Sequence, residues 1–228
     1  MKPLASVALL TLVFACKPKE TVAQNTATPP PAAPPAATAA ATGMVRYDAQ
    51  PTGSKMRIDG TADMVTFTKD WHMDSVLIGG YLEADPKFPE SALTDANAAK
   101  PVVSVFMPVS SFKSGTASMD KRMQKEMKEP QFKKIEYKLI ELKPTSPAGS
   151  TGALKFDAKG ALTVAGKTLT NTMPVTIEKL ADGKLKIKGS TALKMSDYGI
   201  PPPTSMGLFT SGDEVKLTFE WLAAPKAP

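Results

Sequence analysis

The feature that most constrains the fold is an alternation of apolar and polar residues along several short runs. The sharpest case is residues 184–188, in which lysines flank Leu185 and Ile187. A period of two is that of a β-strand with one buried face, because successive side chains point to opposite faces. The same alternation recurs over residues 102–109, 134–139 and 215–221. The sequence therefore predicts an all-β domain.

Turn signals between these runs indicate antiparallel pairing. Asp182-Gly183 is typical of a type I′ hairpin turn and should join residues 173–180 to residues 184–194. Lys159-Gly160 and Gly166-Lys167 predict two further turns in the preceding segment. Many short strands with close turns are typical of an antiparallel sandwich or barrel.

One segment follows a helical pattern instead. Met119, Met123 and Met127 are four residues apart and would share one face of a helix. Ser118 is a suitable N-cap, and Pro130 disfavours helix at the residue before it. We expect a short amphipathic helix over residues 118–128, lying against the sheet.

The N-terminal segment carries an export signal. Lys2 precedes an apolar run over residues 4–14, which is shorter than the ~20 residues of a membrane-spanning helix but suits a signal peptide. The run ends in Val13-Phe14-Ala15-Cys16, which resembles a bacterial lipobox with Phe14 at an unusual position. Cys16 is the only cysteine, so residues 1–15 are predicted to be removed and Cys16 to be lipidated. The alternative is simple secretion, with an incidental Cys16.

Composition divides the rest of the chain. Residues 16–42 are rich in Ala, Pro and Thr and have too little bulky apolar surface to form a core, so we expect a disordered tether. Residues 43–224 are long enough for one domain, and residues 225–228 form a tail. Lys17 stands where an aspartate would retain a lipoprotein at the inner membrane in enteric bacteria. We therefore expect a periplasm-facing cell-envelope protein, with the outer membrane favoured.

Few residues are available for catalysis or metal binding. His72 is the only histidine, and no P-loop or dinucleotide-binding motif is present. A soft copper(I) site at His72 and Met73 is a weaker interpretation than methionines that fill the core. We expect no enzyme, no cofactor and no metal.

The net charge of +6 comes from lysines on alternating strand positions and along the predicted helix. Few aromatic residues are interleaved with them, which argues against nucleic-acid binding. The basic run around the helix is best explained as a solvated face. The alternative is a patch that meets anionic lipid headgroups or a lipid phosphate near a cavity mouth. The run comprises Lys121, Arg122, Lys125, Lys128, Lys133 and Lys134.

The order of several motifs resembles the YceI-like family. The matching segments are residues 109–115 (VSSFKSG), 119–123 (MDKRM), 129–137 (EPQFKKIEY), 160–168 (GALTVAGKT) and 195–203 (MSDYGIPPP). The resemblance implies a lipocalin-like antiparallel β-barrel of about eight strands that binds polyisoprenoid-type lipids. A lipobox and a tether are departures from the family's shorter periplasmic members.

Two functions remain open at this point. One is a barrel that binds an apolar lipid or isoprenoid-type ligand, and the other is a structural or protein-interaction module with a packed interior. Alternation assigns the interior faces, and Tyr137 is the best polar contact for a ligand head because a buried tyrosine seeks a hydrogen-bond partner. The predicted ligand-binding residues are Val103, Val105, Ile135, Tyr137, Leu139, Leu185, Ile187, Val215, Leu217 and Phe219.

The lipobox generates a direct prediction. Cys16→Ala removes the only thiol that could be acylated, so the variant should move from the membrane fraction to the soluble periplasmic fraction. Fractionation followed by immunoblotting measures this change. Full retention of the variant in the membrane fraction would rule out an anchor at Cys16.

Overall fold

The computed structural model describes residues 43–64, 66–94, 100–205 and 209–226. The predicted signal peptide, Cys16 and the tether lie outside the described residues. The strands are β1 (Val45–Ala49), β2 (Lys55–Met64), β3 (Thr68–Ser75), β4 (Gly79–Ala84), β5 (Val102–Pro108), β6 (Lys134–Pro144), β7 (Leu154–Val164), β8 (Lys167–Lys179), β9 (Leu185–Lys194), β10 (Thr204–Ser205) and β11 (Phe209–Pro225). The helices are α1 (Ala117–Glu126) and the short 3₁₀ turns η1 (Glu90–Leu93), η2 (Val109–Ser111) and η3 (Ser196–Tyr198).

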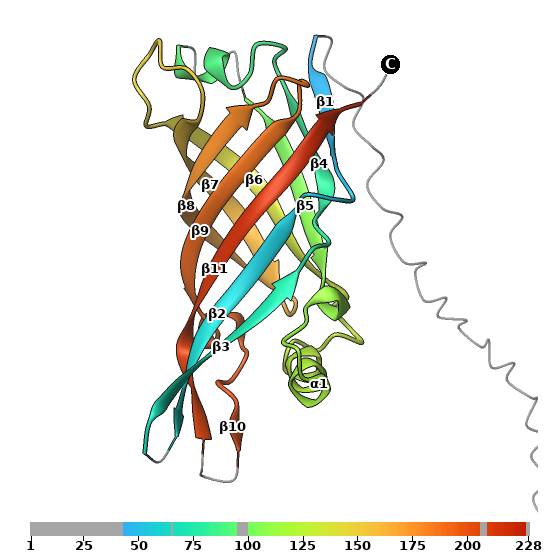
Figure 1. The fold of residues 1–228 in the computed structure, drawn as a ribbon, viewed down its shortest axis with the longest axis vertical. Coiled ribbons are helices and arrows are strands. Elements are labelled where there is room, and N and C mark those ends of the chain that lie inside the picture. Colours follow the sequence, from blue (N-terminus) through green and yellow to red (C-terminus); the bar gives the residue numbers. More distant parts are fainter. Residues whose placement is uncertain (1–42, 65, 95–99, 206–208, 227–228) are drawn as a thin grey trace, which may run out of the picture. The chain divides into compact units, whose positions relative to one another are not determined.

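Eight strands form a closed antiparallel barrel in the order β1-β4-β5-β6-β7-β8-β9-β11. The ring closes where Tyr47 of β1 pairs with Pro225 at the end of β11. Strand β2 pairs with the earlier part of β11, and β3 pairs with β2. Figure 1 shows that β2, β3 and β10 extend beyond the barrel at the end where α1 lies. This architecture confirms the predicted lipocalin-like barrel of about eight strands.

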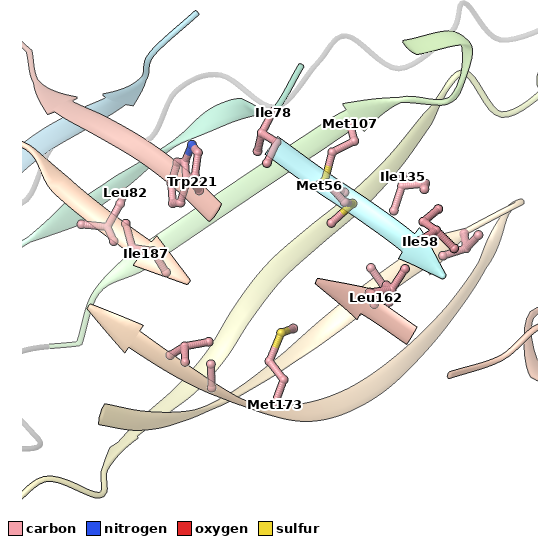
Figure 2. Close-up of a cluster of buried hydrophobic side chains, with 14 of the residues drawn as sticks. Met56, Ile58, Ile78, Leu82, Met107, Ile135, Leu162, Met173, Ile187 and Trp221 are labelled. Carbon is pink, nitrogen blue, oxygen red and sulfur yellow. The ribbon is translucent and has the colours of Figure 1, made fainter. Parts of the chain in front are cut away.

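The core lies inside the barrel because alternation turns one face of each strand inward. Along β7 every second side chain is buried, from Leu154 and Phe156 to Val164. Figure 2 shows Met56, Leu162 and Met173 projecting into this interior from different strands. Burial of an aliphatic or aromatic side chain of this size stabilises the fold by ~1.5–3 kcal/mol.

The predicted turns are partly corrected. A hairpin does connect β8 to β9, but only Gly183 has a positive φ, at 78°, so the turn is not type I′. The Leu180 N–H donates to the Lys184 carbonyl, which closes a three-residue loop with the glycine at the left-handed position. Two successive positive φ values occur instead at Ala165 and Gly166, between β7 and β8.

The turn predicted at Lys159-Gly160 is wrong, because both residues lie inside β7. A glycine normally weakens a strand, but here the aromatic ring of Tyr137 occupies the space that a Cβ would fill. Gly160 is therefore a packing site and not a turn. At the C-terminus, β11 includes Pro225, so the strand extends one residue into the predicted tail.

The helix is present, with corrected ends and position. It begins at Ala117 with Thr116 as the N-cap, so Ser118 does not cap it. The Asp120 carboxylate instead accepts hydrogen bonds from the backbone N–H and the hydroxyl of Ser114. The helix was predicted to lie against the sheet, and the structure places it at the end of the barrel (Figure 1).

Gly80 provides a stability test of the β4–β5 pairing. Its φ of +124° disfavours any side chain, and a Cβ would overlap the Ser104 carbonyl oxygen. Gly80→Ala should lower the free energy of unfolding by about 2–4 kcal/mol, from left-handed strain and displaced backbone. Urea unfolding followed by circular dichroism measures this.

The matched control is Gly149→Ala, which has a φ of +83° but no atom within 4 Å of the added Cβ. This variant keeps the backbone strain without the overlap and should cost only about 1 kcal/mol. Equal losses for the two variants would contradict the close approach of β4 and β5.

Candidate functional site

The barrel interior contains two neighbouring cavities. The inner chamber has a volume of about 100 Å³ and lies among β4–β9 and β11, and the outer chamber has a volume of about 700 Å³ and reaches α1. Small-molecule sites typically measure ~300–1,000 Å³, so the outer chamber alone is large enough for a ligand. Four side chains line both chambers and form the partition between them: Met56, Met107, Leu162 and Leu217.

Most of the predicted ligand-binding residues line these chambers. Those in the inner chamber are Val103, Val105, Tyr137, Leu139, Ile187, Leu217 and Phe219. Ile135, Val215 and Leu217 line the outer chamber. Leu185 differs, because it is fully buried but outside the lining of both. The structure thus places Leu185 in the packed core, and ligand contact by the other residues stays a prediction.

Aromatic rings lie against glycines on the neighbouring strand, which keeps bulky side chains close to the wall. At each of these glycines, the ring occupies the space that a Cβ would need. The ring can therefore lie close to the backbone of the neighbouring strand, and it fills less of the lumen. The pairs are Trp71 with Gly60, Tyr137 with Gly160, and Phe219 with Gly189.

The inner chamber has an apolar surface, and two unpartnered donors are buried in its wall. The hydroxyl of Tyr137 and the indole N–H of Trp221 are buried without a hydrogen-bond partner, and both residues line this chamber. Burial raises the pKa of Tyr137 to about 12, so its hydroxyl stays protonated at neutral pH. Among the described residues, none that lines the inner chamber is charged. A buried polar group without a partner is costly, so a neutral oxygen acceptor that reached either donor would remove that cost.

The outer chamber is covered by α1. Met119, Met123 and Met127 line it, so the predicted methionine face packs toward the cavity. The Arg122 guanidinium donates to the Thr204 carbonyl of β10 and lies 6.0 Å from the centre of the Phe209 ring. This contact joins the helix to the β10–β11 hairpin.

Of the two chambers, only the outer one is lined by charged side chains in the part of the chain that the structure describes. They include both signs: Lys69, Asp70, Arg122, Glu126 and Lys194. Because cations and anions are mixed, the lining as a whole does not select strongly for one charge. The division leaves an uncharged inner end and a mixed-charge outer end.

Sequence reasoning missed the contribution of β2 and β3. Met56 and Ile58 of β2 and Trp71 and Met73 of β3 line the outer chamber. Alternation in β2 was hard to recognise, because Gly60 stands at an interior position where a large apolar residue would mark the pattern. In β3 the only signal was the pair of interior residues Trp71 and Met73.

The copper alternative does not match the geometry. Met73 is buried, whereas His72 faces outward, 3.7 Å from the Asp74 carboxylate, because adjacent residues of a strand point to opposite faces. Within residues 43–64, 66–94, 100–205 and 209–226, no group of three or more His, Cys, Asp or Glu side chains could hold a metal ion. Across the same part of the chain, no helix has the length and apolar character needed to cross a membrane.

A closed antiparallel barrel around an apolar cavity places the protein among the lipocalin-like β-barrels. A family model for the YceI-like domain matches residues 47–223. The chain therefore belongs to the YceI-like family. No curated protein sequence matches it.

Solved structures share this fold at low sequence identity. BcnA of Burkholderia cenocepacia is 18% identical, with a TM-score of 0.58 over 78% of this chain and 100% of BcnA. A polyisoprenoid binding domain from Saccharophagus degradans is 10% identical, with a TM-score of 0.55 over 81% of this chain and 99% of that domain. The YceI protein of Campylobacter jejuni is 17% identical, with a TM-score of 0.50 over 73% of this chain and 85% of that protein.

Tyr137→Phe tests the unpartnered hydroxyl. At neutral pH the free protein should keep its stability or gain up to ~1 kcal/mol, because the substitution removes a buried polar group that has no partner. Binding of a ligand whose oxygen accepts from Tyr137 should weaken by about five- to tenfold. Chemical unfolding and ligand titration measure the two effects.

The same variant has a pH signature. The pKa of Tyr137 is raised from 10.0 to about 12 in the folded protein, so the unfolded chain loses this proton first as the pH rises. The contribution of this pKa difference to the free energy of unfolding is fully present below pH 10 and is lost as the pH rises toward 12. The wild-type protein should therefore lose stability more steeply than Tyr137→Phe across this range. Identical slopes would contradict the burial of the hydroxyl.

Proposed function

We propose that this protein binds an apolar lipid or isoprenoid-type ligand inside the barrel, and that its role is binding and not catalysis. The observation that carries the proposal is the two-chamber cavity. An eight-stranded barrel has room for one small ligand when side chains do not fill it, and here about 700 Å³ remains open in the outer chamber. The polyisoprenoid binding domain from Saccharophagus degradans, which shares the fold, supports the ligand class.

The division of the interior suggests how the ligand lies. An apolar chain would contact the aliphatic and methionine side chains of both chambers, each fully buried CH₂ contributing ~0.8 kcal/mol. The surface of the inner chamber is apolar and none of its described lining residues is charged, while the hydroxyl of Tyr137 and the indole N–H of Trp221 are buried in its wall. A ligand with a neutral oxygen-bearing head would accept from either donor once a rotation of the ring exposes it, with the chain of the ligand in the outer chamber. The predicted role of Tyr137 as the polar contact thus belongs to the inner end of the cavity.

The proposed location is the bacterial cell envelope. The lipobox-like residues 13–16 and the Pro-rich segment after them support a lipid anchor at Cys16 and a tethered barrel facing the periplasm. Lys17 favours the outer membrane. A tether of this length would reach between ~30 Å as a flexible coil and ~80 Å in a polyproline-like form.

The alternative function is a structural or interaction module with a packed interior. The outer chamber argues against it, because a filled barrel would not leave a volume of about 700 Å³. Mass spectrometry of organic extracts from the purified protein distinguishes the two functions. A wild-type protein that carries no lipid and takes up none from added prenols would favour the module.

Ile187→Trp tests the cavity. Ile187 is buried on the wall of the inner chamber, so the larger ring should fill that chamber and lower ligand uptake at least tenfold. The expected overpacking cost is about 1–3 kcal/mol, which thermal unfolding would show. Uptake is measured by mass spectrometry of the extracted ligand.

Lys188→Trp is the matched control. The adjacent side chain is exposed on the outer face of β9, so the same ring is added outside the barrel. This variant should bind as the wild type does. If Ile187→Trp folds and retains the same lipid in the same amount as Lys188→Trp, the ligand lies elsewhere.

A further inference from the structure

We propose that the end of the barrel beside α1 docks onto an anionic lipid bilayer. The docking surface, called here the mouth surface, consists of Met64 and Phe67 at the tip of the β2–β3 hairpin and Lys121, Lys125 and Lys128 along α1 and just after it. The proposal goes beyond ligand binding, because it assigns a partner to the outside of the protein.

The tip of the β2–β3 hairpin carries two solvent-exposed apolar side chains. Phe67 is 57% exposed and Met64 is 38% exposed, and the Met64 N–H donates to the Phe67 carbonyl. Their two side chains therefore belong to one turn. An exposed aromatic beside a second apolar residue at a projecting tip suits the boundary between lipid headgroups and acyl chains.

Helix α1 adds a cationic face. Lys121, Lys125 and Lys128 are exposed, whereas the two acidic residues of the helix are partly buried. Asp120 is held by Ser114, and Glu126 is half-buried at the outer chamber. The most exposed charges of the helix are therefore positive. Lysines close to an anionic membrane each contribute about fivefold to binding.

The rest of this end carries both signs, which limits the purely electrostatic contribution. Lys69 and Lys194 lie at the outer chamber together with Asp70, and Asp63 accepts a hydrogen bond from Thr68 on the hairpin. Binding should therefore depend on the apolar tip and the helix lysines together. An increase in ionic strength should weaken it without abolishing the apolar contribution.

The tip and the helix border the same cavity. Met64 of the hairpin and Met119 and Met123 of α1 all line the outer chamber. Figure 1 shows the β2–β3 hairpin and α1 at one end of the barrel. A bilayer that contacts the mouth surface would therefore face the outer chamber, and an apolar molecule could pass between the two with little exposure to water. The exposure of apolar surface to water is what makes the transfer of a lipid through water unfavourable.

Vesicle binding tests the proposal. The protein is prepared from Lys17 onward, which retains every described strand and helix. This removes the apolar run of residues 4–14 and the acylation site Cys16, because the apolar run or an acyl chain on Cys16 could bind vesicles itself. Co-sedimentation is measured with vesicles of phosphatidylglycerol and phosphatidylcholine and with phosphatidylcholine alone. We expect binding to the anionic vesicles and much weaker binding to the neutral ones.

Two variants address the two parts of the mouth surface. Phe67→Ser should weaken binding about tenfold through the lost apolar burial. Lys121→Glu combined with Lys125→Glu should weaken it at least 25-fold, because two attractive charges become repulsive. Thermal unfolding confirms that both variants are folded.

Matched controls change the same chemistry elsewhere on the barrel. Ile140→Ser removes a side chain that is 59% exposed on β6, and Lys155→Glu with Lys159→Glu reverses two exposed lysines of β7. Both controls should bind as the wild type does. Wild-type protein that fails to bind, a mouth variant that binds normally, or a control that loses as much binding as its counterpart would overturn the proposal. Co-sedimentation requires contact with the intact bilayer, whereas a lipid molecule taken into the cavity would leave the protein in the supernatant, so this result is distinguishable from lipid uptake.

Discussion

The architecture depends on β11, because one edge of this strand pairs with two different strands, β2 and β1, along its length. Each residue of a strand can pair with only one neighbour on each edge. One edge of β11 pairs with β10 and then, from Glu214 onward, with β9, and the other pairs first with β2 and then, from Ala223 onward, with β1. The ribbon of β2 and β3 therefore leaves the wall where β1 takes its place, and the free edge of β3 is joined to the segment before α1 by the Asp74–Lys113 backbone pair. The outer chamber lies beneath this divergence.

This divergence gives the two ends of the lumen different chemistry. The inner chamber is enclosed by barrel strands, so its lining comes from alternating apolar side chains and has no charge. The outer chamber is bordered by the departing ribbon, by α1 and by the segment around η3, which bring charged residues to its rim. The lumen therefore has an uncharged inner end and a polar rim, although the same alternation of inward and outward side chains forms its walls.

Alternation predicted which faces turn inward, because that property depends only on the two-residue period of a strand. It could not predict how far along the barrel a residue lies, so Leu185 and Ile187 were grouped although only Ile187 lines a chamber. Gly160 was interpreted as a turn because its packing partner, Tyr137, belongs to another strand. The position of α1 at the barrel end likewise depends on tertiary contacts that its methionine spacing does not contain.

The aromatic–glycine pairs also restrict how such a barrel can diverge during evolution. A side chain cannot be gained at Gly60, Gly160 or Gly189 while the facing ring remains in place. The ring must first become smaller, and each intermediate then carries a wall with less apolar packing. Within the family, the two positions of a pair should therefore change together and in a fixed order, so that pairwise covariation would preserve the shape of the lumen after overall sequence identity has been lost.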